Sequence, residues 1–406
     1  MTTTLALALL SIFRQLRRSM TAVLAIAFGI MALLLASGFI EWNLRYGRES
    51  TIHSELGHIR LFKPGFLQSG LADPYGYLLD SDAMRDEKIQ QLPHVELLTP
   101  RLSFNGLASH EESTISFIGE GVDPTREERL SRSLTIVSGK GLSADHPKGI
   151  IVGQGLAANL GVAPGDTMVL MVTSATGGVN AVEVTILGLF ATITKAYDDA
   201  ALRVPISVAR QLLRVSGSHT YAILLDKTES TPAILSELQR QFPGHDLEFV
   251  PWYEMADFYN KTAELFSRQV NVVRLIIAAI IVLSISNTLM MNVMERTGEI
   301  GTVMAIGVKR REVLLQFLAE GLILGVIGGI LGLVLAYMLG SLISAIGIPM
   351  PAPPGMSFGY TAEILITLPM MTEAFILAAS TTLLASIIPA IKASRMEIVN
   401  ALRHNR

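Results

Sequence analysis

The chain has 406 residues, of which 50% are hydrophobic and only 17% are charged, and its formal net charge is −3. Because ordinary soluble domains carry about 25% charged residues, this composition predicts that much of the chain faces lipid. A charge so close to zero gives no reason to expect nucleic-acid binding. The absence of cysteine excludes disulfides, thiolate metal sites and a lipid-modified N-terminal cysteine.

Four apolar segments are long enough to cross a bilayer, which requires about 20 mostly apolar residues. These predicted spans are residues 20–40, 270–294, 317–348 and 364–391. Arg14, Arg17 and Arg18 precede the first span, as in a secretory signal, but its apolar run is longer than that of a signal. We therefore expect an uncleaved anchor, with residues 1–19 forming a cytoplasmic amphipathic segment.

Basic residues indicate the orientation of the spans. Lys and Arg precede the first span, follow the fourth in residues 392–406, and gather between the second and third in residues 295–316. Because basic loops stay on the cytoplasmic side, both termini are expected in the cytoplasm. Residues 41–269 and the short loop 349–363 are then expected outside it.

The segment 41–269 is large enough for one or two folded units, and strand-like and helix-like runs alternate along it. Strands are predicted at 58–62, 95–107, 114–120, 182–190, 202–205 and 220–225, and helices at 82–92 and 232–242. The predicted fold class is an α-helical membrane protein with four transmembrane helices and a large, two-lobed, mixed α/β extracytoplasmic domain between the first two. The lobes are expected at about 41–145 and 146–268.

This outer segment shows no sign of a catalytic, cofactor or metal site. Gly153-x-Gly155-x-x-Ala158 resembles a dinucleotide-binding fingerprint, but the helix that follows is short, so a tight turn explains the glycines. The eight histidines lack metal-ligand spacing, and Asp198-Asp199 is interpreted as a solvated acidic pair. The sequence has no G-x-x-x-x-G-K-[ST] motif, which excludes ATP hydrolysis by a P-loop in this chain.

The connection between the second and third spans is dense in charge, and a short charged helix there would suit the docking of a soluble partner. The third span then carries glycines at GxxxG spacing, which lets another helix approach closely. These glycines are Gly321, Gly325, Gly328, Gly329 and Gly332. The spacing fits packing within one chain and a seam between two chains equally.

From Asn287 to Gly321 the chain reads N-T-x-x-M-x-V-x-E-R-x-x-E-I-G-x-x-x-A-I-G, followed by F-L-x-E-G. This pattern resembles the second-to-third span region of FtsX/MacB-type (type VII) ABC transporter permeases. The tail Ser386–Arg403 is similar to the closing motif of that family, except that Glu397 stands where proline is usual.

The resemblance implies a permease in a bacterial inner membrane, paired with two copies of a separate ABC ATPase that binds ATP and Mg²⁺, and with a second permease copy or paralogue. It implies contacts to the ATPase from eight residues. Polar contacts would come from Glu295, Arg296, Glu299 and Lys309, and packing contacts from Ile300, Val303, Ala305 and Gly307. The spans would carry ATP-driven motion to the outer domain by mechanotransmission, with no catalytic site and no cofactor in this chain.

Three outer stretches, 57–66, 153–166 and 186–200, resemble the lipoprotein-release (Lol-type) permeases most. This implies extraction of lipoproteins, or another lipid-anchored substrate, from the outer leaflet, with a periplasmic lipoprotein chaperone as a partner. Phe39, Ile40 and Trp42 would contact the substrate, although an aromatic interface belt also accounts for Trp42. The alternatives are a MacB-like tripartite exporter with an adaptor, and an FtsX-like regulator of a cell-wall hydrolase that transports nothing.

Overall fold

The structure is a computed structural model, and it describes Arg14 and residues 16–70, 72–192, 194–244, 246–352 and 359–397. The chain divides into two compact units. The helical unit contains the chain up to Leu44, Thr262–Pro349 and the chain from Thr361 onward, and the sheet unit contains Arg45–Lys261 and Met350–Tyr360. Most of the predicted N-terminal amphipathic segment and the end of the tail lie outside the described residues.

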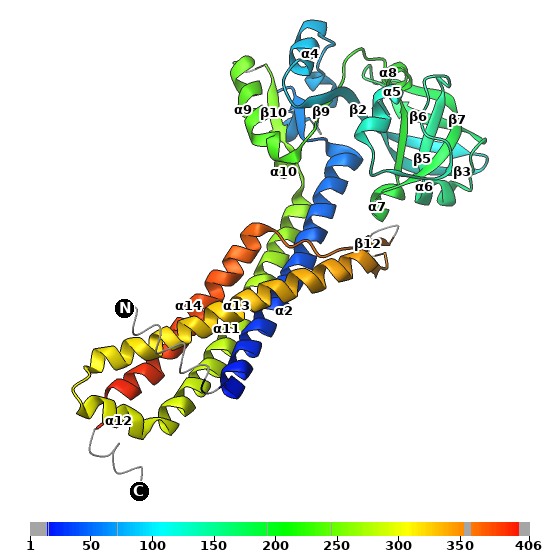
Figure 1. Ribbon diagram of the computed structural model, residues 1–406. Coiled ribbons are helices and arrows are strands. Elements are labelled where there is room, and N and C mark those ends of the chain that lie inside the picture. Colours follow the sequence, from blue (N-terminus) through cyan, green and yellow to red (C-terminus); the bar gives the residue numbers. More distant parts are fainter. Residues whose placement is uncertain are drawn as a thin grey trace. The chain divides into compact units, whose positions relative to one another are not determined.

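The helical unit is built from long apolar helices (Figure 1). They are α2 (Leu16–Thr51), α11 (Asp257–Glu295), α13 (Arg310–Ile346) and α14 (Leu368–Ser394), with the short α12 (Thr297–Ala305) between α11 and α13. Within the described residues, these four long helices have the length and hydropathy needed to cross a membrane. Their shared core contains Ile26, Ile30, Ile281, Ile285, Leu324, Ala336 and Ala378.

Two of these helices extend beyond their predicted spans. α2 continues to Thr51, and α11 already begins at Asp257. Residues 41–51 and 257–269, which are predicted in the outer domain, are therefore helical continuations of α2 and α11, and of these, residues 45–51 and 257–261 belong to the sheet unit. The helices are longer than the predicted spans because a polar helical extension lacks the apolar composition by which a span is recognised.

The single helix predicted over 295–316 is divided into two. Gly307 adopts a φ of 107°, a left-handed conformation that favours glycine and ends the helical path after α12. α13 then begins at Arg310, and the Glu312 carboxylate accepts a hydrogen bond from the Lys309 N–H at 3.4 Å. The last part of the predicted helix therefore belongs to the third long helix.

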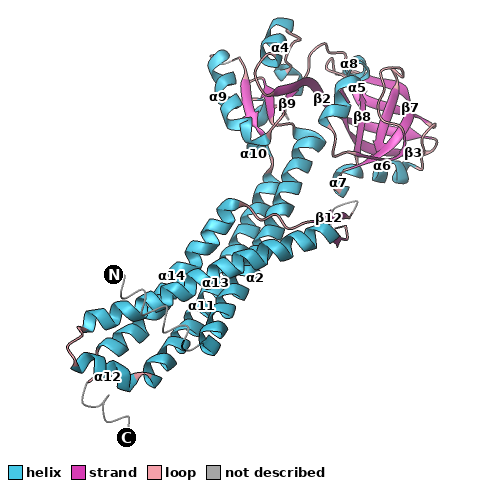
Figure 2. Cartoon of the chain, in the orientation of Figure 1, coloured by secondary structure: helices cyan, strands magenta, loops and turns pink. Residues whose placement is uncertain are grey.

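The sheet unit contains a ten-stranded sheet in the order β10-β1-β9-β2-β3-β8-β5-β7-β4, with β6 paired to β2 and β7 (Figure 2). The strands are β1 (Ile59–Phe62), β2 (Val95–His110), β3 (Ser113–Val122), β4 (Thr135–Gly139), β5 (Gly149–Gly153), β6 (Thr167–Thr173), β7 (Val179–Ala191), β8 (Ala201–Pro205), β9 (Thr220–Leu225) and β10 (Glu248–Pro251). The β3–β8 and β5–β7 pairs are parallel, and the other pairs are antiparallel.

Short helices connect and cover these strands. They are η1 (Ile52–Leu56), α3 (Phe66–Ser69), η2 (Pro74–Tyr77), α4 (Ala83–Gln90), α5 (Pro124–Leu130), α6 (Gln154–Leu160), α7 (Lys195–Asp198), α8 (Ile206–Leu213), η3 (Thr228–Ser230), α9 (Thr231–Gln241) and α10 (Trp252–Met255). A two-stranded ribbon, β11 (Ile348–Met350) and β12 (Tyr360–Ala362), lies between α13 and α14 in the chain. This mixed α/β unit between the first two long helices confirms the predicted fold class.

Two hydrophobic cores in the sheet unit correct the predicted lobes. One core combines residues from both ends of the unit, including Ile59, Ile89, Leu98, Ile223 and Leu238. The other lies between these ends in sequence and includes Leu102, Phe117, Ile150, Val184 and Leu202. One lobe is therefore inserted into the other, because β1 near the start pairs with β9 near the end, and β2 contributes to both cores.

A buried ion-pair network crosses the inserted lobe. Arg101 and Arg203 are fully buried, and Arg101 lies 2.6 Å from the Glu120 carboxylate and 3.0 Å from that of Glu127. Arg203 also pairs with Glu127, and its Nη2 donates to the Ser54 carbonyl at 2.7 Å. Burial alone would raise the pKa of Glu127, but the two guanidinium groups hold it below its ordinary value.

The turn with Gly153 and Gly155 is explained by close packing. Asp198 is buried, and its carboxylate accepts hydrogen bonds from the N–H and hydroxyl of Thr192 at 2.9 and 2.8 Å, which corrects its interpretation as a solvated residue. A Cβ at Gly153 would lie 2.2 Å from the Asp198 carbonyl oxygen, and one at Gly155 would lie 1.8 Å from Asp199 Oδ1. Only glycine leaves room for this turn.

Candidate coupling site

One face of α12 packs inside the helical unit. Ile300 and Met304 are only 7% and 6% exposed. They belong to a cluster with Val293 of α11, Phe317 of α13 and Ala390 of α14. Because the chain itself covers Ile300, this side chain is not presented to a partner, which corrects its predicted role.

The opposite face ends in an exposed apolar tip. Ile306 is 80% exposed and Val303 is 41% exposed, with Ala305 and Gly307 exposed beside them. The exposed polar residues that follow are Lys309, Arg310, Arg311 and Glu312. An exposed apolar patch with a polar rim is typical of a protein contact site. We call Val303, Ala305, Ile306 and Gly307 the coupling tip.

The acidic residues beside α12 are paired within the chain. Glu295 forms an ion pair with Arg18 in the first turn of α2, and Glu299 forms one with Arg14, which precedes α2 in the chain. Arg296 Nε also donates to Glu299 Oε2 at 3.3 Å. The hydrogen bond from Arg14, aided by Arg296, lowers the pKa of Glu299. The sequence predicted both carboxylates as contacts to a partner, whereas the structure pairs them with Arg18 of α2 and with Arg14 just before it.

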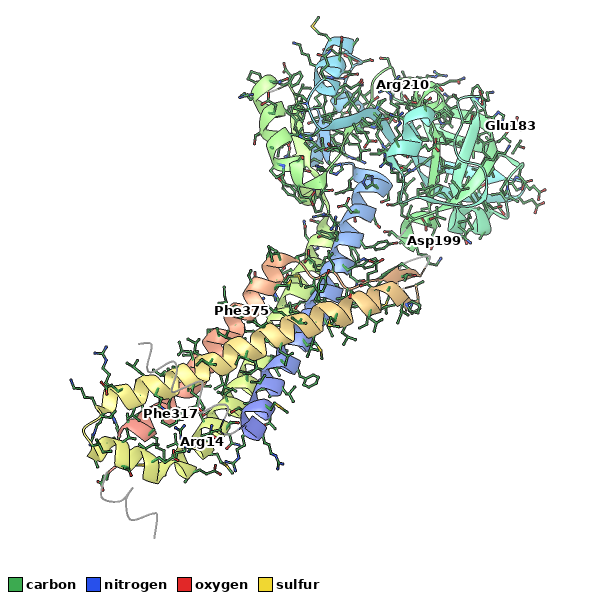
Figure 3. The ribbon with its side chains drawn as sticks, viewed as in Figure 1. Arg14, Glu183, Asp199, Arg210, Phe317 and Phe375 are labelled. Atoms are coloured by element: carbon green, nitrogen blue, oxygen red, sulfur yellow. The ribbon has the colours of Figure 1, made fainter. Side chains whose placement is uncertain are left out.

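Arg296 joins the start of α12 to the buried side of α13. Its Nη1 lies 3.7 Å from Glu320 Oε2, and its guanidinium carbon lies 5.9 Å from the centre of the Phe317 ring. Asn292 Nδ2 donates to Glu320 Oε1 at 3.4 Å. Figure 3 labels Phe317 and Arg14 at the end of the helical unit that carries α12. A buried carboxylate is costly unless it is paired, and Arg296 is the basic partner of Glu320. This ion pair joins the two halves of the sequence motif, because Arg296 lies in the first half and Glu320 in the second.

The glycines of α13 pack against helices of the same chain. Three face α14, where Gly321 meets Ser386, Gly325 meets Thr382 and Gly329 meets Phe375; two face α2, where Gly328 meets Ile26 and Gly332 meets Ile30. The closest approach is at Gly325, where an added Cβ would lie 2.0 Å from Thr382 Oγ1. Packing within one chain therefore accounts for all five glycines.

Two cavities lie near those ends of the long helices that are far from α12. One, of about 290 Å³, lies between α2, α11 and α14 and contains an Arg274–Glu373 ion pair of 2.9 Å. The other, of about 490 Å³, lies between α2 and α11. Its apolar lining includes Ala36, Ile40, Leu265, Val270, Val272 and Val273. Of the predicted substrate contacts, Ile40 lines both cavities, whereas Phe39 and Trp42 are half-buried and line neither.

Sequence reasoning missed three features of this region. Ile306 lies in the A-I-G part of the motif and Glu320 in F-L-x-E-G, so the motif itself contained both signals. Arg14 and Arg18 were interpreted only as orientation signals, because their partners lie far away in the sequence.

Two family models together cover most of the chain. A model described as a MacB-like periplasmic core domain matches residues 19–241, and one described as an FtsX-like permease C-terminal region matches residues 271–398. Among solved structures, the extracellular domain of the noncanonic ABC-type transporter YknZ from Gram-positive bacteria has a TM-score of 0.36 at 11% identity, covering 48% of this chain and 100% of that one. The periplasmic region of MacB from Actinobacillus actinomycetemcomitans also has a TM-score of 0.36 at 11% identity, covering 50% and 94%.

Curated relatives share parts of the chain. The uncharacterized ABC transporter permease YvrN of Bacillus subtilis is 32% identical over 30% of this chain and 26% of its own length. The pyoverdine export ATP-binding/permease protein PvdT of Pseudomonas putida is 29% identical over 43% of this chain and 25% of its own. The macrolide export ATP-binding/permease protein MacB of Brucella abortus is 32% identical over 35% and 20%. The matches thus span about a quarter of the length of these relatives. Because the MacB-like model alone matches more than half of the chain, this protein belongs to the FtsX/MacB-type family of ABC transporter permeases.

Proposed function

We propose that this chain is a permease subunit that works by mechanotransmission in a bacterial inner membrane. Separate ABC ATPase subunits, which bind ATP and Mg²⁺, hold the coupling tip and move it as they close and open. The long helices then pass this motion to the sheet unit. The observation that carries the proposal is the exposure of Val303 and Ile306 between two candidate spans, where a soluble partner can cover them.

The residues around the coupling tip indicate what kind of surface it fits. Ile306 is the most exposed apolar side chain of the region, so the partner needs an apolar pocket to receive it. Lys309, Arg310 and Arg311 lie beside the coupling tip and favour acidic residues around that pocket. Glu295 and Glu299 are already paired with Arg18 and Arg14, so they do not oppose such an acidic rim.

The helical unit suits motion better than it suits a hydrophilic pore. Its shared core is apolar, and the glycines of α13 bring three helices into close contact. Glu320, the buried carboxylate in α13, lies near α12 and is paired with Arg296. A transported polar solute would need a lined aqueous path, which this packing does not supply.

The substrate that fits best is a lipid-anchored molecule, such as a lipoprotein, taken from the outer leaflet. The cavity of about 490 Å³ between α2 and α11 is lined mainly by apolar side chains, including Ile40 and Val270, with Ser37, Arg268 and Gln269 beside them, and suits an acyl chain. A lipoprotein chaperone would then receive the cargo. The second candidate is a tripartite exporter with an adaptor, and the similarity to the export proteins PvdT and MacB favours export.

The test is purification of the tagged, full-length protein from its own membranes in mild detergent. We expect an ABC ATPase to co-purify and to hydrolyse ATP in the complex. Acylated protein or lipid in the complex supports extraction from the membrane, whereas an adaptor without lipid-anchored cargo supports the exporter. If no ATPase co-purifies, the proposed function is wrong.

A matched pair of variants makes this test specific. Ile306→Glu places a charge at the coupling tip, and we expect it to abolish co-purification of the ATPase. Val179→Glu makes the same change at a residue of the sheet unit with 78% exposure, close to the 80% of Ile306, and should leave co-purification intact. Equal losses in both variants would point to a general defect rather than to docking.

A further inference from the structure

α2 reaches the coupling region through charged side chains. The apolar cluster beneath α12 takes its buried residues from α11, α12, α13 and α14, and no described residue of α2 belongs to it. Within the described residues, α2 joins the apolar core of the helical unit from Ala22 onward, together with residues of α11 such as Leu289. Before that point, the ion pairs Arg14–Glu299 and Arg18–Glu295 link the chain to α12 and to the end of α11. The direct link to α12 is therefore electrostatic.

The neighbouring Arg17 shows that this pairing is selective. Arg14 lies just before α2, and Arg18 lies in its first turn. Arg17 is exposed and forms no ion pair with another described residue. A basic residue near the inner headgroups can serve orientation alone, which explains Arg17 but not the matched acidic partners of Arg14 and Arg18.

Chain connectivity shows why α2 needs such a link. α12 follows α11 and precedes α13 with only short connections, so motion of the coupling tip passes to those helices through the backbone. α2 is separated from α12 in the chain by the whole sheet unit. Side-chain contacts must therefore carry motion from α12 to the inner end of α2.

We infer that Arg14 and Arg18 are positioning residues, which make the inner end of α2 follow the coupling tip when the ATPases move it. This inference rests on the proposed function. Glu299 and Glu295 receive the two guanidinium groups, one carboxylate on α12 and the other at the end of α11. The Arg18–Glu295 pair holds the first turn of α2, and the Arg14–Glu299 pair holds the chain just before it, so that the inner end of the helix moves with both elements.

Exposure of these pairs separates this role from a role in stability. The four side chains are between 42% and 60% exposed. Exposed ion pairs contribute little to folding free energy, so their loss should leave the helical unit folded. Their loss should instead release α2 from the coupling region.

The experiment measures the motion of α2 directly and needs no known substrate. The chain contains no cysteine, so Glu41→Cys on α2 and Leu368→Cys on α14 provide two unique, exposed spin-label sites within the helical unit. Labelled permease is reconstituted with unlabelled ATPase subunits, and the distance between the labels is measured by pulsed EPR without nucleotide and with ATP plus vanadate. We expect a shift in this distance for the otherwise unchanged chain.

The variants are made in an Arg14→Ala background, in which Arg18–Glu295 is the remaining pair. Arg18→Glu and Glu295→Arg should each abolish the shift, and Arg18→Glu combined with Glu295→Arg should restore it. Arg17→Glu is the matched control on the same helix and should keep the shift. A full shift in Arg18→Glu, or a failure of the combined variant to recover it while the thermal midpoint is unchanged, would overturn the inference.

Co-purification of the ATPase distinguishes the two levels of the account. If the ATPase binds every variant and only the shift responds to the charge changes, both the inference and the proposed function stand. If the ATPase binds and the charge changes leave the distance shift unaltered, the inference is wrong but the proposed function stands. If the ATPase does not bind the unchanged chain, the proposed function fails and the inference fails with it.

Discussion

Replacement of Gly325 by alanine should destabilise the helical unit from within one chain. An added Cβ would lie 2.0 Å from Thr382 Oγ1 and 2.9 Å from Thr382 Cβ. Thr382 is fully buried, and its hydroxyl donates to the Ala378 carbonyl at 2.9 Å, so it cannot turn away without losing that hydrogen bond. Overpacking of a tight site typically costs about 1–3 kcal/mol, and the higher helix propensity of alanine offsets up to about 1 kcal/mol of this. With the full offset, we expect a net loss of up to about 2 kcal/mol.

The measurement is the thermal midpoint of the detergent-purified protein. Gly329→Ala is the matched control, because an added Cβ there would lie 3.2 Å from Phe375 Cδ2, a contact that small adjustments relieve. Gly325→Ala should lower the midpoint more than Gly329→Ala does, and Thr382→Ala should recover part of the loss. If Gly325→Ala leaves the midpoint unchanged but abolishes association between permease copies, the glycines form a seam between chains and the reasoning is wrong.

Three further predictions concern stability. Burial lowers the pKa of His58 to about 4, and its Nδ1 accepts a hydrogen bond from the Leu225 N–H, so between pH 6.5 and 4 the unfolded chain binds a proton that the folded chain does not. The free energy of unfolding of the sheet unit should therefore fall by about 3 kcal/mol as the pH falls through that window. In urea unfolding, the free energy of unfolding of His58→Gln should depend less on pH. Arg203→Met should cost about 3–5 kcal/mol in urea unfolding because it leaves buried carboxylates underpaired, and adding Glu127→Gln should recover part of that loss. Ile300→Glu should lower the thermal midpoint strongly, whereas Ile306→Glu should leave it unchanged.

Composition and periodicity were sufficient to predict the long helices and much of the sheet. The strand predicted at 220–225 is β9, and the helix predicted at 232–242 is close to α9, because both segments have a clear local pattern. The division of lobes could not be predicted in this way. Pairing between β1 and β9 brings together segments that lie far apart in the sequence, and no local pattern reports such a contact.

In the coupling site too, the sequence could not predict which individual side chains are buried and which are exposed. The motif located α12 correctly, but it could not say that Ile300 packs inward while Ile306 is exposed. Gly307 ends α12 with a left-handed backbone conformation, which turns the chain towards α13 and leaves Ile306 at the exposed end of the helix. The partners of Glu295 and Glu299 are Arg18 of α2 and Arg14 just before it, and the whole sheet unit separates them from these carboxylates in the sequence.

The most direct test of the account is photocrosslinking from the coupling tip. A photoreactive amino acid replaces Ile306 in the full-length protein, and Val179 in a control, and the membranes are irradiated before solubilisation. The account predicts that position 306 crosslinks to an ATP-binding subunit and that position 179 does not. Crosslinks from position 306 to lipid alone, or to no ATP-binding protein, would contradict the claim that this tip receives the motion of an ATPase.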